Sequence, residues 1–177
     1  MYWQSMIIIF SPLIGAITLL FKNKSTDFLS SIIANSAIGV SMLLSLWLFI
    51  LYMSGHNVSE SHLIYTWYAT SGYFFEIGLL VDSLTIIMSF IVTFISFFVH
   101  MYSIAYMKGD PSFKRFFIYT NFFTFSMLFI IFSNNFLQLF IGWELVGLSS
   151  YLLIGFWYNK PSAVSANLKA FVVNRVG

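Results

Sequence analysis

The chain has 177 residues, of which 59% are hydrophobic and only 8% are charged, and its formal net charge is +2. A soluble domain carries about 25% charged residues, so this composition excludes a surface that faces water over most of its area, and the lipid bilayer is the expected solvent. The few, scattered basic residues argue against a nucleic-acid partner, and the lack of cysteine excludes disulfides, thiolate metal sites and cysteine nucleophiles.

Five apolar runs are long enough to cross a bilayer, which takes about 20 apolar residues in a helix. The first run has no basic leading region and no Ala-x-Ala site, so we expect it to stay in the membrane as a span. Lys160 and Pro161 interrupt the chain after the fifth run, and a sixth helix is expected to begin near Ser162. The predicted fold class is all-α, a polytopic transmembrane helical bundle with about five complete spans and the start of a sixth. The five runs are residues 2–21, 28–53, 79–107, 116–132 and 136–158.

The loops between the spans carry their positive charges on one side only. Every loop Lys or Arg follows the first, third or fifth run, and the loops after the second and fourth runs have none. Because Lys and Arg resist translocation, this pattern predicts an N-terminus outside and odd-numbered loops in the cytoplasm or matrix. No repeat or change of composition divides the chain, so residues 1–177 are predicted to form a single membrane domain. The loop cations are Lys22, Lys24, Lys108, Lys114, Arg115 and Lys160.

The stretch of residues 54–78 is too long for a tight turn and too aromatic for a free linker. Strand-forming residues lie on both sides of Ser71 and Gly72, at residues 66–68 and 73–75. A small hairpin on the outer face would satisfy their backbone groups, and an interfacial belt of aromatic side chains is the alternative. Further along the chain, residues 133–135 are predicted to make a tight turn between two spans.

Glu144 lies well inside the fifth span, where a charge costs about 2.5–3.5 kcal/mol on insertion scales. Gly147, Tyr151 and Gly155 share its helix face, and small residues there allow a second helix to approach closely. This face is therefore predicted to look toward protein. Burial favours the neutral acid and a nearby cation favours the carboxylate, so a carboxyl held between these effects can take up and release protons. A fixed ion pair or a neutral, hydrogen-bonded acid is the structural alternative.

Lys169 and Arg175 lie on the sixth helix and project about 120° from each other, so they cannot both face one partner on a straight helix. One of them is expected to pair with Glu144, and the other would serve a second site or snorkel toward an interface. Lys169 is nearer to Lys160 and is the better candidate for snorkelling. Arg175 is deeper and is the better candidate for a pair.

Two further titratable residues belong to the third span. Asp82 lies near its outer end and is predicted to act as a helix N-cap. His100 lies near its inner end, together with Tyr102 and Tyr106. An imidazole titrates near neutrality, so His100 could carry protons, and hydrogen bonding at an interface is its commoner role.

No redox, nucleotide or metal site is predicted. The sequence has no P-loop, no dinucleotide fingerprint and no Cys for iron–sulfur ligation. Its three His do not fall at axial haem positions on facing mid-membrane helices. The expected chemistry is therefore the transfer of protons or ions and not of electrons.

Several segments of the sequence resemble one family of membrane subunits. The most specific is Ile-Gly-Trp-Glu-Leu-Val-Gly-Leu-Ser-Ser-Tyr at residues 141–151, and Lys-Ala-Phe-Val-Val-Asn-Arg-Val-Gly at residues 169–177 looks like the family's next block. The whole chain, in one register, resembles chain L of the bacterial proton-pumping NADH:quinone oxidoreductase (complex I), which matches mitochondrial subunit 5. The other segments that fit are Asp82-Ser83-Leu84, residues 100–107 and Arg115-Phe116-Phe117.

The resemblance implies a long helical bundle with two inverted five-helix repeats, each containing a broken helix. It implies proton movement across the membrane, driven by quinone reduction elsewhere in the complex. Glu144 matches the family's key protonatable group, whose Lys partner lies on a later helix that this sequence does not include. The sequence is therefore expected to be an N-terminal part of an antiporter-like subunit, truncated within the first repeat. The candidate residues for proton translocation are Glu144, Lys169, Arg175, Asp82 and His100.

The resemblance also implies partners and cofactors. Other membrane subunits of complex I, the lipid bilayer and protons are the expected partners. No cofactor is expected in this chain, and NADH, FMN, iron–sulfur clusters and quinone are expected in partner subunits. The expected location is the bacterial inner membrane or the mitochondrial inner membrane, with multiple passes.

Three alternatives stay open at this point. A large subunit of a multisubunit cation/proton antiporter has a similar sequence, and a membrane-bound hydrogenase subunit is a variant of the same idea. An inactive truncated fragment or a structural scaffold is the alternative that transports nothing. The coupling ion, H⁺ or Na⁺, is open as well.

Overall fold

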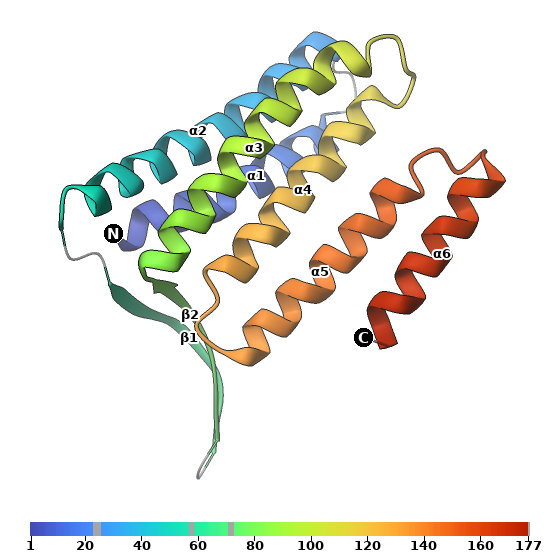
Figure 1. Cartoon of the computed structure of the whole chain (residues 1–177). Coiled ribbons are helices and arrows are strands. Elements are labelled where there is room, and N and C mark those ends of the chain that lie inside the picture. Colours follow the sequence, from blue (N-terminus) through green and yellow to red (C-terminus); the bar gives the residue numbers. More distant parts are fainter. Residues whose placement is uncertain (23–25, 57–58, 71–72, 177) are drawn as a thin grey trace.

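The structure is a computed structural model that describes residues 1–22, 26–56, 59–70 and 73–176 (Figure 1). Within these residues it is mostly helical, with six helices and one antiparallel pair of strands. Lys24, Ser71, Gly72 and Gly177, to which parts of the predictions refer, lie outside the described residues. The elements are α1 (Tyr2–Phe21), α2 (Asp27–Met53), β1 (Glu60–Thr70), β2 (Tyr73–Val81), α3 (Ser83–Tyr106), α4 (Phe113–Ile131), α5 (Phe136–Ile154) and α6 (Pro161–Val176).

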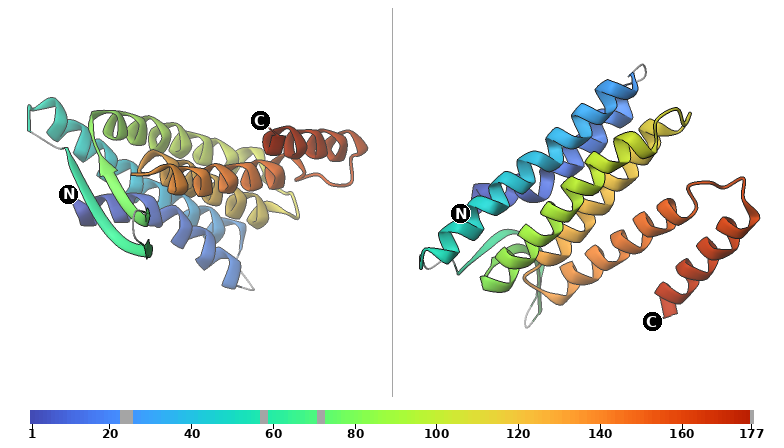
Figure 2. Two further views of the ribbon diagram at one scale, coloured as in Figure 1. Left: turned by 90° about the horizontal axis from the view of Figure 1, so that it is seen from below. Right: turned by 45° about the horizontal axis from the view of Figure 1, so that its top comes forward.

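Helices α1 to α4 form a bundle, and α5 and α6 extend from it on one side (Figures 1 and 2). α1 packs against α2 and α4, and α3 packs against α2 and α4. α5 packs on the outer side of α4, and α6 packs chiefly on α5. The α5–α6 pair therefore lies at the edge of the bundle, with α5 as the chief neighbour of α6.

Four of the described helices are long and apolar enough to cross a membrane: α1, α2, α3 and α5. α4 has 19 residues and begins three residues earlier than predicted, so that Lys114 and Arg115 lie in its first turn. α5 ends at Ile154, short of the predicted end at Tyr158. A proline disfavours helical backbone in the residue before it and suits the first position of a helix, so Pro161 opens α6 and separates it from α5.

The predicted hairpin is present, and the predicted start of the third span is wrong. The third span was expected from residue 79, but residues 79–81 belong to β2 and pair with residues 60–62 of β1. α3 begins only at Ser83, because the Asp82 side chain accepts a hydrogen bond from Thr85 N at 2.7 Å and caps the helix. The predicted N-cap role of Asp82 is thereby confirmed.

Strand β2 is tied to the turn between α4 and α5, which reverses the chain at residues 132–135 as expected. Leu80 N donates to Phe132 O at 3.1 Å, Gly78 N donates to Gln138 Oε1 at 3.1 Å, and Asn135 Nδ2 donates to Glu76 O at 2.6 Å. A Cβ on Gly78 would lie only 2.0 Å from Asn134 Nδ2, so the strand can approach the turn only with glycine at this position.

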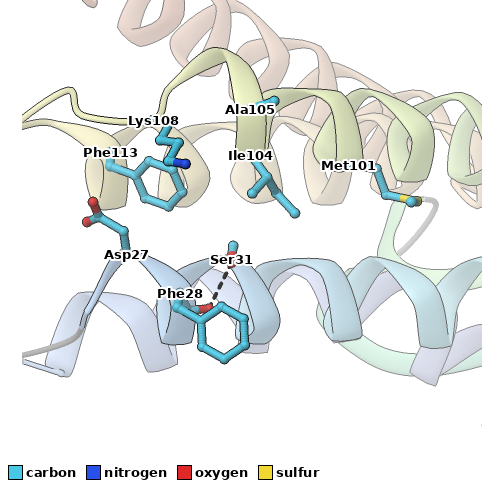
Figure 3. Close-up of a pocket in the computed structure, with 8 residues that line it drawn as sticks. All are labelled: Asp27, Phe28, Ser31, Met101, Ile104, Ala105, Lys108 and Phe113. Carbon is cyan, nitrogen blue, oxygen red and sulfur yellow. Dashed lines mark hydrogen bonds between the residues drawn. The ribbon is translucent and has the colours of Figure 1, made fainter.

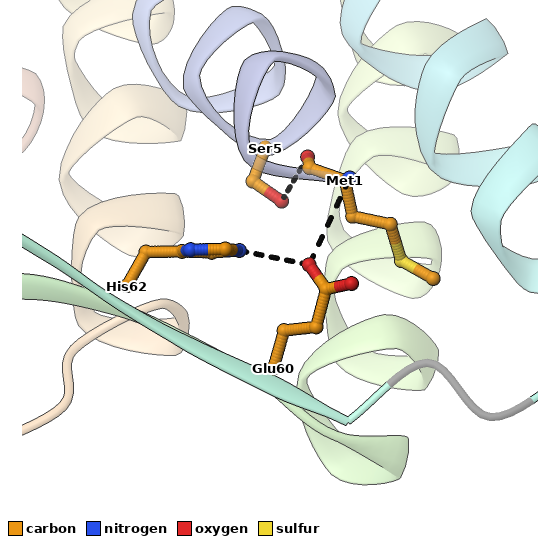
Figure 4. A network of polar contacts seen from close by, with 4 residues as sticks. All are labelled: Met1, Ser5, Glu60 and His62. Carbon is orange, nitrogen blue, oxygen red and sulfur yellow. Dashed lines mark hydrogen bonds and ion pairs between the residues drawn. The ribbon is translucent and has the colours of Figure 1, made fainter.

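Strand β1 is tied to the start of α1 by a small polar network (Figure 4). Glu60 Oε2 lies 3.7 Å from the N-terminal ammonium of Met1 and 2.8 Å from His62 Nε2. The hydrogen bond from His62 lowers the pKa of the Glu60 carboxyl below its ordinary value. The Tyr2 and His62 rings meet edge to face with centroids 5.4 Å apart, so the hairpin base is fixed to the bundle from both strands.

Both apolar and polar side chains fill the inside of the bundle. Two buried apolar clusters lie toward its two ends, one around Ile8, Leu48 and Phe132 and the other around Leu19 and Phe117. Hydroxyl and amide side chains are buried with them and bond mostly to helix carbonyls. Small polar residues of this kind are typical of contacts between membrane helices, where lipid supplies the apolar surroundings. Buried examples are Ser41, Ser45, Ser89, Thr93, Asn121, Thr124 and Ser126. Thr124 shares a hydrogen bond with Ser96.

The two ends of the bundle differ in charge. Lys114 Nζ donates to Lys22 O at 2.6 Å, and Arg115 Nη2 donates to Phe156 O at 3.2 Å, so the loops after α1, α3 and α5 lie at one end. We call it the cation end, and it also carries Lys108 and Lys160. The opposite end, the hairpin end, carries Glu60, Glu76 and Asp82, and residues 54–82 contain no Lys or Arg.

Candidate functional site

Helix α5 holds Glu144 near its middle and directs it toward α6. Asn135 caps the helix by accepting a hydrogen bond from Gln138 N at 2.8 Å. Gly142 faces α4, since a Cβ there would lie 2.6 Å from Ile130 Cγ1. Glu144 is two residues further on, about 200° around the helix, and therefore faces away from α4.

The Glu144 carboxylate forms an ion pair with the guanidinium of Arg175 on α6. The side chains are 27% and 43% exposed, respectively, so neither group is sealed inside the described structure. The Arg175 guanidinium also lies over the Phe171 ring, 4.8 Å from its centroid. Of the two cations expected to compete for Glu144, the structure selects Arg175, as the sequence favoured.

The face of α5 that carries Glu144 contacts α6 through glycines, as predicted. A Cβ on Gly147 would lie 2.5 Å from Asn174 Nδ2, and one on Gly155 would lie 2.4 Å from Asn167 Nδ2. Between them, the Tyr151 ring meets the Phe171 ring edge to face at 5.3 Å. Each asparagine amide thus occupies the space that a larger residue on α5 would fill.

Lys169 lies on α6 away from the ion pair. Its side chain is exposed, and it lines a groove between α5 and α6 together with Ser150, Tyr151 and Asn174. It makes no ion pair with the described acids, which fits a cation that reaches toward an interface.

His100 is buried inside the bundle. Hydrogen bonding at a membrane interface was expected as its commoner role. Its residue is 1% exposed, and Nδ1 lies 2.8 Å from Ser96 O. Nε2 is buried and has no hydrogen-bond partner in the described residues. His100 lines a cavity together with Thr120 and Thr124 of α4, and Ser96 Oγ lies 2.5 Å from Thr124 Oγ1.

Asp82 lies at the hairpin end and belongs to a different part of the molecule from Glu144. The hydrogen bond from the backbone N–H of Thr85 lowers the pKa of the Asp82 carboxyl. A carboxylate held charged by its own helix start is a cap, and the structure brings no other candidate residue to it.

A groove at the cation end, between α2 and α3, is separate from all five candidates (Figure 3). Asp27 lies at its α2 side and Lys108 at its α3 side, with Phe28, Met101 and Ile104 along its apolar length. None of the candidate residues lines it.

The arrangement supports acid–base chemistry. Among the described residues, no group of three or more His, Cys, Asp and Glu side chains could hold a metal ion. A carboxylate in mid-helix whose charge is balanced by one arginine can exist as a pair or as a neutral acid beside a free cation. The site can therefore bind and release one proton for each opening of the pair.

Sequence reasoning missed three residues in and beside the α5–α6 contact. Arg115 was assigned only to a loop, but its guanidinium lies 4.9 Å from the centroid of the Phe156 ring and bonds to Phe156 O. Asn167 and Asn174 were not singled out. Their spacing of seven residues places both on one helix face, and this pattern opposite Gly147 and Gly155 was the available signal.

Comparison with known families matches two parts of the chain, which together make up more than half of it. Residues 67–117 match the family described as NADH-Ubiquinone oxidoreductase (complex I), chain 5 N-terminus. Residues 133–177 match the family described as NADH:quinone oxidoreductase/Mrp antiporter, TM. The second match includes Glu144 and all of α6.

Individual relatives are similar over nearly the whole chain. NADH-quinone oxidoreductase subunit L of Neisseria meningitidis is 45% identical over 174 residues, which are 97% of this chain and 26% of that protein. NADH-ubiquinone oxidoreductase chain 5 of Arabidopsis thaliana is 44% identical over 177 residues, 97% of this chain and 26% of that protein. Subunit L of Escherichia coli is 36% identical, with 94% and 27% covered. The chain thus spans about a quarter of the length of these relatives.

The fold also matches a solved structure. A chain of the archaeal respiratory complex called membrane-bound sulfane sulfur reductase superposes with a TM-score of 0.76 at 18% identity. The match covers 95% of this chain and 33% of that chain. At this level of identity it supports the helical arrangement alone.

Proposed function

Because the chain belongs to the family of NADH-quinone oxidoreductase subunit L and chain 5, we propose that it takes part in proton translocation in the membrane arm of such a complex. In this role it is part of a translocase and has no redox centre of its own. The observation that carries the proposal is the ion pair between Glu144 and Arg175, placed in the middle of a membrane helix.

The proton step follows from the electrostatics of this pair. While Arg175 lies beside Glu144, the carboxylate is the favoured form. When the guanidinium moves away or meets another anion, the carboxylate in its low-dielectric surroundings takes up a proton. When the cation returns, that proton is expelled. Driving this cycle from a distance requires only that the position of a cation be coupled to quinone reduction elsewhere.

His100 is a second candidate proton carrier. Its buried Nε2 has no partner in the described residues, and the residue lines a cavity together with Thr120 and Thr124, within the same bundle but on α3 and not on α5. Lys169 would adjust the charge of the α5–α6 groove, and Asp82 would act only through the stability of α3. The order of importance we propose is therefore Glu144 and Arg175 first, His100 and Lys169 next, and Asp82 last.

The proposed topology has five spans, α1 to α5, with α6 entering a sixth and the N-terminus outside. The cations gathered at one end support it, because Lys and Arg stay on the side from which a chain is inserted. The cation end would then face the bacterial cytoplasm or the mitochondrial matrix, and the hairpin end would face the outer side of an inner membrane. Residues 1–177 would form one membrane domain, the N-terminal part of an antiporter-like subunit.

The proposed partners are the other membrane subunits of the complex. NADH, FMN, iron–sulfur clusters and quinone would be bound by partner subunits, since the described residues offer no metal cluster and the sequence has no nucleotide motif. This chain would contribute protonatable side chains and the helices that position them.

The test is Glu144→Gln in the assembled complex, reconstituted in vesicles with NADH as the electron donor. We expect the part of NADH-driven acidification that is due to this subunit to fall by at least about tenfold. General acid–base groups raise the rate of a proton transfer by about 10²–10⁴-fold. Glu76→Gln on the hairpin is the matched control and should pump normally. Unchanged pumping by Glu144→Gln at normal assembly would refute the proposed role.

A multisubunit cation/proton antiporter subunit is the second candidate, because the family description that matches residues 133–177 names both kinds of protein. A subunit of that kind would exchange Na⁺ for H⁺ without any electron donor. Vesicles that acidify only on addition of a Na⁺ gradient, and not of NADH, would favour this second function.

A further inference from the structure

The groove between α2 and α3 at the cation end is apolar along its length and open on the outside of the bundle (Figure 3). It has a volume of about 590 Å³. Of the side chains that line it, Phe28 is 73% exposed and Met101 is 50% exposed. In a membrane, a surface of this kind is covered either by acyl chains or by another helix.

A second groove continues the first one toward the middle of the same two helices. It has a volume of about 540 Å³ and lies between α2 and Phe97 of α3. On α2, the residues that line the two grooves recur every three or four positions from Phe28 to Leu43, so they share one helix face. We call the two grooves together the α2–α3 groove.

The length of the α2–α3 groove matches one leaflet of a bilayer. Gly39, which lines its deeper part, lies 12 residues after Asp27, or about 18 Å along the helix axis. Half of the hydrocarbon core is about 15 Å thick. An acyl chain in the groove would therefore extend from the interface at the cation end to the middle of the membrane.

Opposite charges flank the groove where it opens at the cation end. Asp27 is the first residue of α2, and Lys108 follows the end of α3. Both residues are exposed, and neither forms an ion pair within the described part of the chain. Lys114, at the same end, is already bonded to Lys22 O at 2.6 Å. Asp27 and Lys108 are thus left to offer one anion and one cation to a ligand.

Each of these charges also has an ordinary role by itself. A carboxylate is favourable in the first turn of a helix, and a lysine is favourable on the side from which the chain is inserted. Neither role requires the side chain to line a groove. The ordinary roles therefore leave unexplained why one apolar groove carries an acid on its α2 wall and a base on its α3 wall.

We propose that the α2–α3 groove is a binding site for one molecule of phosphatidylethanolamine. Asp27 accepts hydrogen bonds from the primary ammonium of the headgroup, Lys108 donates to the phosphate, and an acyl chain lies along the groove as far as Gly39. The site is independent of the proton step at Glu144. Only the leaflet rests on the proposed topology, in which the lipid belongs to the cytoplasmic or matrix leaflet.

The acid at the opening selects among common headgroups. The quaternary ammonium of phosphatidylcholine has no N–H to donate to Asp27. Phosphatidylglycerol has no cation, so its phosphate would pair with Lys108 while its net negative charge lies close to the Asp27 carboxylate. Of these three lipids, phosphatidylethanolamine alone satisfies both charges through hydrogen bonds.

Photo-crosslinking of the complete subunit in its complex tests the site. The complex is reconstituted in phosphatidylcholine vesicles that contain a small, equal fraction of one of three probes. The probes share a diazirine-bearing acyl chain and differ in the headgroup: phosphatidylethanolamine, phosphatidylcholine or phosphatidylglycerol. After illumination, mass spectrometry locates the labelled residues. We expect the phosphatidylethanolamine probe to label residues 28–43 and 97–108 at least about threefold more than the other two, a ratio that one exposed ion pair can supply.

Neutral variants test the two charges separately. Asp27→Asn should lower labelling by the phosphatidylethanolamine probe to the level of the phosphatidylcholine probe. Asp110→Asn is the matched control, because Asp110 lies at the same end, does not line the groove, and accepts from Ser112 N at 2.7 Å through an oxygen that the amide keeps. Lys108→Gln should also lower labelling by the phosphatidylethanolamine probe, and Lys160→Gln, outside the groove, should leave it unchanged.

A reversed charge should change the preferred lipid. Asp27→Lys places two cations at the opening, so the phosphatidylglycerol probe should then label the groove more than the phosphatidylethanolamine probe. The added cation lies on the side that already carries the loop cations, so the orientation of the chain should be kept. If Asp27 acted only on the stability of α2, this variant would change labelling by all three probes alike, and that result would overturn the proposal.

Two further results would refute the site. Equal labelling of the groove by the three probes would show that the charges select no headgroup. Labelling elsewhere on the subunit with none in the groove would show that a protein segment covers it in the complex. Glu144→Gln should leave the labelling unchanged, so the lipid site and the proposed proton role can fail independently of each other.

Discussion

The carboxylate of Glu144 on α5 forms an ion pair with the guanidinium of Arg175 on α6, and α5 is the chief packing partner of α6. The pair is one of few polar links between α5 and α6, and the glycines beside it bring the two backbones close. The same contact therefore links α6 to α5 and places a cation beside the acid.

The double variant Glu144→Gln/Arg175→Gln should lose less stability than the sum of the losses in the two single variants. Glu144→Gln leaves the Arg175 cation without its partner, and Arg175→Gln leaves the carboxylate alone, whereas the double variant leaves neither. Since both side chains are partly exposed, we expect a coupling of only about 1 kcal/mol. Thermal unfolding of the four proteins in detergent measures it. The cycle of Glu144→Gln with Lys169→Gln should be additive, and equal coupling in both cycles would contradict the assigned pair.

Two glycines in the first two helices should respond oppositely to alanine. A Cβ on Gly15 would lie 2.6 Å from Ala37 Cβ, a short side chain that cannot turn aside, so Gly15→Ala should cost about 1–3 kcal/mol by forcing α1 from α2. At Gly39 the nearest atom would be Phe97 Cε2 at 3.5 Å, an ordinary contact. Gly39→Ala should therefore be neutral, or stabilising by up to about 1 kcal/mol, through helix propensity. Melting temperatures of the two variants would decide, and equal shifts would show that the α1–α2 contact is looser than described.

The cap of α3 should make the stability of that helix depend on pH. Because the pKa of Asp82 is lowered in the folded state, the cap contributes fully above the ordinary carboxyl value of 3.8 and is lost as the pH falls through the lowered value. Asp82→Ala should cost about 1 kcal/mol at neutral pH, and Asp82→Asn should cost less, since an amide oxygen still accepts from Thr85 N. Asp82→Asn should also flatten the loss of stability at acid pH, measured by denaturation between pH 3 and pH 7. A profile identical to that of the unchanged protein would argue against the cap as the source.

The hairpin should loosen when its tie to α5 is cut. Gln138→Leu leaves the buried Gly78 N–H without its acceptor, at a cost of about 1–3 kcal/mol, and Gln138→Glu keeps an acceptor in place. Hydrogen exchange of the β2 amides, followed by mass spectrometry, should accelerate in the first variant and much less in the second. If both variants exchange alike, the side-chain bond is not what holds the strand.

Much of the helical plan could be predicted from apolar length alone, and the places where it failed have physical causes. Leu79 and Leu80 read as the start of a span because hydropathy does not distinguish a buried strand from a helix. Only the pairing with residues 60–62 and the cap at Asp82 decide it. α5 was predicted too long for a similar reason, since Phe156 and Trp157 are apolar but follow the helix end at Gly155.

The candidate site could be predicted only in part. A single acid within an apolar span can be recognised from the sequence. Helix geometry places Lys169 and Arg175 on different faces of α6, so only one of them could pair with Glu144, and the deeper Arg175 was preferred. The burial of His100 could not be predicted, because it depends on packing against α4. The Phe117 ring of α4 lies with its centroid 5.9 Å from that of the His100 ring. Arg115 lies in the first turn of α4 and reaches Phe156 across 41 positions of sequence, a contact that no local pattern encodes.

In the proposed topology, the position of Glu144 near the midpoint of α5 would make its protonation sensitive to membrane voltage. Moving one elementary charge across the full bilayer against 100 mV takes about 2.3 kcal/mol, so a proton that reaches half depth takes up about half of that. The ratio of protonated to ionised carboxyl would then shift by about sevenfold per 100 mV, with no change in the pH on either side. For a proton that enters from the cation end, which the proposed topology places on the negative side, an energised membrane would oppose its uptake by this one side chain.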